Sequence, residues 1–191
     1  MCSRRGYLKT GKPFSGSLGY RFGWNAGGRM GGGFDIAYEL HDAGWASVSV
    51  AYNGQSFKQA VSYLHDSLGD LAALGVALQN GGRITEQKVL FLDEPGELAL
   101  LAYAEEGSPD AELLLLHSAD WFFSFGFTAR GQETLWRGRV PRHELAGKIH
   151  RILHHLYCHI GEAEYLRRWG EHPFPSEGYL KLHEQLKWTL E

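Results

Sequence analysis

The sequence contains no long apolar run and very few cysteines. No apolar segment approaches the ~18 residues that a membrane-spanning helix needs, so we expect no membrane segment and no membrane partner. Cys2 and Cys158 are the only cysteines and lie far apart, which gives no disulfide framework and fits a reducing compartment. Arg4 and Arg5 are not followed by the apolar stretch of a secretory signal. Together these absences predict a cytoplasmic protein.

Motifs that mark common enzyme classes are also missing. The sequence has no Gly-x-Ser-x-Gly, no Cys-x-x-Cys and no helix-turn-helix signature. The glycine-rich stretch GGRMGGG at residues 27–33 lacks the lysine and the strand–helix context of a phosphate-binding loop. We therefore predict no cofactor and assign no catalytic residue, but missing motifs alone leave open whether the protein is an enzyme.

Charge and glycine content divide the chain into two parts. Residues 1–33 carry six basic residues, no acidic ones and ten of the 25 glycines, without apolar periodicity. Such a segment buries too little apolar surface to offset the entropy of ordering, so we expect a flexible basic tail. Residues 34–191 carry 13 basic and 22 acidic residues, a net charge of −9, and are expected to form a single domain. Its acidic surface favours a basic protein partner, and nucleic acid is not expected as a partner.

Hydrophobic periodicity predicts an α+β fold. Two main helices are expected at residues 66–79 and 141–160, with shorter helices at 162–169 and 177–190. Apolar or alternating segments indicate strands at residues 34–40, 45–52, 55–61, 88–92, 98–104, 113–117, 121–128 and 135–140. Because the strands occur in runs, we expect one antiparallel sheet of seven or eight strands packed against the two main helices.

The segment at residues 141–160 is the longest amphipathic helix that the sequence predicts. Its apolar stripe is spaced three or four residues apart and consists of Leu145, Ile149, Ile152, Leu156 and Ile160. Outside the stripe, His150 and His154 are four residues apart, as are His155 and His159. Such pairs on one helix can share a metal ion, but a zinc site needs a third protein ligand. The alternative is a solvated histidine-rich surface.

A second candidate site is the acidic turn DEPGE at residues 93–97. Asp93, Glu94 and Glu97 crowd one hairpin connection. Carboxylates at an exposed turn can present an acidic binding surface, although Asp, Pro and Gly are also common turn residues for conformational reasons. We therefore treat these three carboxylates as candidate binding residues for a partner, with turn chemistry as the alternative.

Three segments read together resemble a group of small uncharacterised bacterial proteins. They are SYLHDSLGDL at residues 62–71, DEPGE at residues 93–97 and RWGEHPFP at residues 168–175. The resemblance covers roughly residues 34–190 and implies no assigned activity and no catalytic residue. In size, compactness and acidity such proteins are similar to the immunity or accessory proteins encoded beside bacterial toxin genes.

From these observations we expect a non-enzymatic, protein-binding module of the bacterial immunity or accessory type. This expectation rests on the acidic domain, on the missing catalytic motifs and on the resemblance. The alternative is a metal-binding protein or an enzyme that uses the histidine-rich helix between residues 143 and 159.

Overall fold

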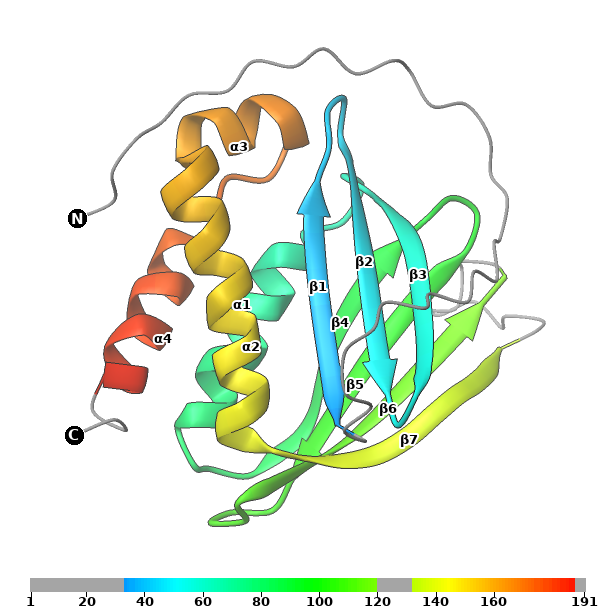
Figure 1. The fold of residues 1–191 in the computed structure, drawn as a ribbon, viewed down its shortest axis with the longest axis vertical. Helices are drawn as coiled ribbons and strands as arrows, with labels where there is room; N and C mark the ends of the chain where they lie inside the picture. Colours follow the sequence, from blue (N-terminus) through cyan, green and yellow to red (C-terminus); the bar gives the residue numbers. More distant parts are fainter. Residues whose placement is uncertain (1–32, 120–131, 188–191) are drawn as a thin grey trace.

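The computed structural model describes residues 33–119 and 132–187, and within these ranges it contains seven strands and four α-helices (Figure 1). The strands form two antiparallel sheets, which confirms the predicted α+β class. The first sheet consists of β1 (Phe34–Leu40), β2 (Trp45–Tyr52) and β3 (Gln55–Ser62), in that order. The second sheet consists of β4 (Ile84–Leu92), β5 (Glu97–Ala104), β6 (Asp110–Ser118) and β7 (Glu133–Pro141), also in chain order.

The prediction of a single sheet is wrong, because these strands divide into two layers. Helix α1 (Ser67–Gln79) separates β3 from β4 in the chain, and no backbone ladder joins the two described sheets. The sheets meet through side chains instead. The ring centroid of Trp136 on β7 lies 5.8 Å from that of Phe34 on β1. The Trp136 ring also stacks on Tyr52 of β2, with centroids 4.8 Å apart. Figure 1 shows the first sheet in front of the second.

Helix α1 is enclosed by protein almost all round, as its apolar pattern predicts. Asp66 caps its N-terminus, where the carboxylate accepts a hydrogen bond of 2.9 Å from the N–H of Gly69. Of its thirteen residues only Ala73 is exposed. The helix contacts β4, α2 and α4, so it forms the base on which the later helices pack.

The histidine-rich helix has the predicted extent, but its geometry changes near its end. Helix α2 (Arg142–His155) continues into a π-helical turn, Leu156–Ile160. After α3 (Glu162–Trp169), helix α4 (Ser176–Lys187) returns beside α2 and α1 (Figure 1). The last two helices therefore place the C-terminal part of the described chain against the histidine-rich face.

Helix α4 approaches α1 closely at Gly75. A Cβ atom at this position would lie 2.6 Å from Leu182 Cδ2 and 3.1 Å from Ile149 Cγ2. A larger residue would therefore displace α4 or α2. Since Leu182 is fully buried, this contact fixes α4 beside α2 and sets the separation of the side chains that the two helices present to each other.

One main hydrophobic cluster draws residues from both sheets and all four α-helices. The predicted strand at residues 121–128 lies outside the described residues, as does the predicted tail apart from Gly33, so the domain boundary stays a prediction. Within the described ranges, no helix is long and apolar enough to cross a membrane.

Candidate metal centre

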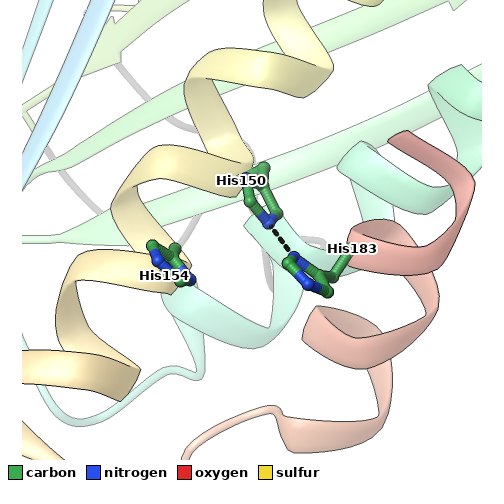
Figure 2. Close-up of side chains that lie close together, drawn as sticks. All are labelled: His150, His154 and His183. Atoms are coloured by element: carbon green, nitrogen blue, oxygen red, sulfur yellow. Dashed lines mark hydrogen bonds between the residues drawn. The ribbon is translucent and has the colours of Figure 1, made fainter. Parts of the chain in front are cut away.

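Three histidines converge between α2 and α4 (Figure 2). His150 and His154 lie on α2, and His183 lies on α4. The Nε2 atom of His150 is 2.8 Å from Nδ1 of His183. One ring nitrogen from each histidine belongs to a set whose members all lie within 4.8 Å of one another. Zinc ligands at about 2.0–2.1 Å from the ion stand roughly 3.3 Å apart in a tetrahedron, so small side-chain rotations would bring these nitrogens around one ion.

Helical spacing brings His150 and His154 to the same side of α2. Residues four apart on a helix are neighbours, and these two rings stack with centroids 5.5 Å apart. The apolar stripe of α2 faces the core, since Leu145, Ile149 and Ile152 are buried. The two histidines stand beside this stripe, on the flank that faces α4 (Figure 2).

The packing of α4 places the third imidazole, that of His183, beside α2. Tyr179 and Leu182 are buried and anchor this helix against its neighbours. His183 follows Leu182 directly and is half-buried. Its ring stacks on those of His150 and His154, with centroids 5.0 and 6.0 Å away. Apolar contacts of α4 therefore determine where this histidine meets α2.

Tyr179 also orients one of the α2 histidines. Its hydroxyl oxygen lies 2.8 Å from Nδ1 of His154, and the tyrosine is 3% exposed. Burial raises the pKa of Tyr179, so the phenol stays protonated at neutral pH. Because Nδ1 of His154 is engaged by this hydroxyl, Nε2 is the nitrogen left for a metal ion. Partners of this kind hold metal-binding histidines in a defined tautomer and ring orientation.

The environment of His150 and His183 favours neutral imidazole. Burial, followed by the neighbouring His183 and His154, lowers the pKa of His150 to about 4. Burial, followed by Lys187, also lowers the pKa of His183. Among the described residues, the cluster contains no carboxylate. Since the neutral ring is the form that coordinates a metal, His150 and His183 can bind one at neutral pH without first losing a proton to solvent.

His155 and His159, the other two predicted ligands, form a separate pair. Both are exposed, and their ring centroids are 4.7 Å apart. In the described part of the chain, no third histidine, cysteine or carboxylate completes a cluster with them. Two of the four predicted ligands thus join the three-histidine cluster. His183 was not among the predicted ligands, because its approach to α2 follows from tertiary packing and leaves no spacing signal in the sequence.

Cys158 supplies no ligand in this structure. Its Sγ lies 3.7 Å from both ring nitrogens of His154, but the cysteine is disulfide-bonded. A disulfide sulfur lacks the thiolate charge with which cysteine binds metals. The wide separation of the two cysteines in the sequence did not indicate this disulfide.

The acidic turn does not form one solvated surface. Glu94 is exposed, Asp93 is half-buried, and Glu97 is only 1% exposed at the start of β5. The N–H of Asp93 donates to the carbonyl oxygen of Gly96 at 2.9 Å, which closes the turn. Burial raises the pKa of Asp93, against the opposing effect of His117. Of the three carboxylates only Glu94 is fully accessible, and their role in binding a partner stays a prediction.

Comparisons with protein-family models, with curated proteins and with solved structures find no match to this chain. The resemblance to small bacterial proteins therefore stays a prediction, and so do the immunity or accessory type of function and the basic protein partner. The geometry of the three-histidine cluster is the strongest basis for a functional argument.

Proposed function

We propose that the protein binds a divalent transition metal ion, zinc above all, through His150, His154 and His183. The observation that supports this most directly is the approach of three imidazoles from two helices, with potential ligand atoms within 4.8 Å of one another. A solvated histidine-rich surface on α2 would account for His150 and His154. It would not account for a partly buried contact of 2.8 Å with a histidine from a different helix.

The choice of ion follows from the donor atoms. Imidazole nitrogen suits zinc, copper, iron and nickel, whereas calcium and magnesium require oxygen ligands. Three neutral histidines match the ligand count of zinc sites that keep one coordination position free of protein. Tyr179 adds support, because it engages His154 as a partner of a metal ligand would.

Metal titration by calorimetry, together with elemental analysis, tests this proposal on protein purified without a histidine tag. We expect one zinc ion per chain and loss of that binding in His183→Ala. The matched control is His159→Ala, which removes an exposed histidine outside the cluster and should leave binding unchanged. Circular dichroism verifies that both variants fold. Absence of stoichiometric zinc, or equal binding by His183→Ala and the parent protein, would refute the proposed function.

A further inference from the structure

The proposed metal site leaves one coordination position without a protein donor. Zinc is bound by four ligands in most protein sites, and the cluster provides three. Cysteine and carboxylate groups of the described residues are absent from this cluster, which contains only His150, His154 and His183. Three neutral imidazoles also leave the double positive charge of the ion uncompensated. A fourth ligand that carries a negative charge would therefore be held more strongly than a neutral one.

The fourth coordination position is accessible from solvent and has exposed apolar side chains near it. His154 is exposed, so a ligand can reach the ion from solvent. Tyr157 lies three residues after His154 and is 37% exposed, and Leu180 lies three residues before His183 and is 51% exposed. Residues three apart on an α-helix are neighbours, so Leu180 flanks His183 on α4. Tyr157 also packs on Tyr179, at a centroid distance of 4.9 Å.

We propose that the metal-loaded site binds a small carboxylate whose organic part is apolar. The carboxylate oxygen would take the fourth coordination position and neutralise part of the charge. The organic part would lie against Leu180 and Tyr157. This inference rests on the proposed metal site, and it adds the class of ligand that the site takes.

Cobalt(II) is the probe for this inference, because its visible absorption reports changes in its ligands. The full-length protein is loaded with cobalt and titrated with acetate, with butyrate and with butyramide, the neutral analogue of butyrate. Both carboxylates should change the spectrum with saturation, and butyramide should not. Butyrate has two methylene groups more than acetate. It should bind at least about fourfold more tightly, which is the gain from burying one of them.

A pair of leucine variants separates the apolar contact from metal binding. Leu180→Ser should abolish the preference for butyrate over acetate and leave the affinity for cobalt unchanged. Leu166→Ser is the matched control. It removes a different exposed leucine, which lies on α3 and not on α4, and should keep the preference for butyrate.

Each outcome separates this inference from the proposal on which it rests. Failure to bind cobalt would refute the metal site itself. If cobalt binds but its visible spectrum does not change when carboxylates are added, only the ligand inference is refuted. A sulfur-to-cobalt charge-transfer band would also refute the ligand inference, since a cysteine thiolate released from its disulfide would then occupy the fourth position. Equal affinities for acetate and butyrate would refute the apolar part of the ligand.

Discussion

The Nε2 atom of His150 and the Nδ1 atom of His183 lie 2.8 Å apart, although 33 residues separate the two histidines along the chain. Two neutral rings at this distance share a single proton, so one nitrogen donates and the other accepts. A metal ion would bind both nitrogens once that proton has moved to the other nitrogen of its own ring, so both imidazoles would stay neutral. The same contact that joins α2 to α4 through a hydrogen bond can thus join them through coordination.

Zinc should stabilise the fold, because it links two helices in the native state only. At a free zinc concentration about 100 times the dissociation constant, the gain in unfolding free energy is about 2.7 kcal/mol. For a protein of this size that corresponds to a rise of about 5–10 °C in the melting temperature. Differential scanning calorimetry with and without zinc measures it. His183→Ala should show no rise, and an equal rise in that variant would contradict the proposed ligand set.

The unfolding free energy of the metal-free protein should depend on pH in the way expected for a His150 that is neutral in the folded state. Burial lowers its pKa in the folded state to about 4, whereas in the unfolded chain the pKa has its ordinary value of 6.5. Between these values the unfolded state binds the additional proton, so this group lowers the unfolding free energy as pH falls from about 6.5 to about 4. An NMR titration of the imidazole resonances follows the group directly. A midpoint for His150 near 6.5 would show that the ring is solvated.

Tyr179→Phe should weaken zinc binding with little effect on the fold. The substitution keeps the buried ring and removes the hydroxyl that lies 2.8 Å from Nδ1 of His154. Loss of such a partner typically costs about 10–100-fold in metal affinity. Tyr157→Phe is the matched control, since this ring packs nearby but its hydroxyl has no described contact with a ligand. If both variants bind zinc like the parent, Tyr179 does not position His154.

Arg142 should contribute more to stability than an exposed arginine on the same helix. It is 5% exposed, and its guanidinium donates to the carbonyl oxygens of Gly82 and Glu105. Arg142→Ala leaves both carbonyl groups without this donor, so we expect a loss of about 2–4 kcal/mol in unfolding free energy, measured by urea denaturation. Arg151→Ala, at an exposed position on the same helix, should change it by less than about 0.5 kcal/mol. Similar losses in the two variants would contradict the bridging role.

Local periodicity predicts what lies along one element, and tertiary packing decides which elements meet. The spacing of His150 and His154 is visible in the sequence, because both belong to one helix. His183 lies beside α2 because Leu182, the residue before it, packs against Gly75, which has no side chain. No sequence pattern indicates such a contact. Proximity within one helix also suggested His155 and His159, but the fold brings no further ligand to them from the described residues.

The sheets and the acidic turn illustrate the same limit. Runs of strands predict antiparallel pairing correctly, but periodicity does not show where the hydrogen-bonded ladder stops between β3 and β4. Glu97 belongs to the acidic turn in the sequence, yet it pairs with Leu92 and Ser118 across neighbouring strands and is buried there. Its burial follows from the position of β5 at the centre of the second sheet.

X-ray absorption spectroscopy of the zinc-loaded protein tests the metal site most directly. The account predicts three imidazole nitrogens at about 2.0–2.1 Å, together with one further oxygen ligand. His183→Ala, if it retains any zinc, should show at most two imidazoles. A spectrum with one or two imidazoles in the parent protein, or with sulfur at about 2.3 Å, would contradict the three-histidine site.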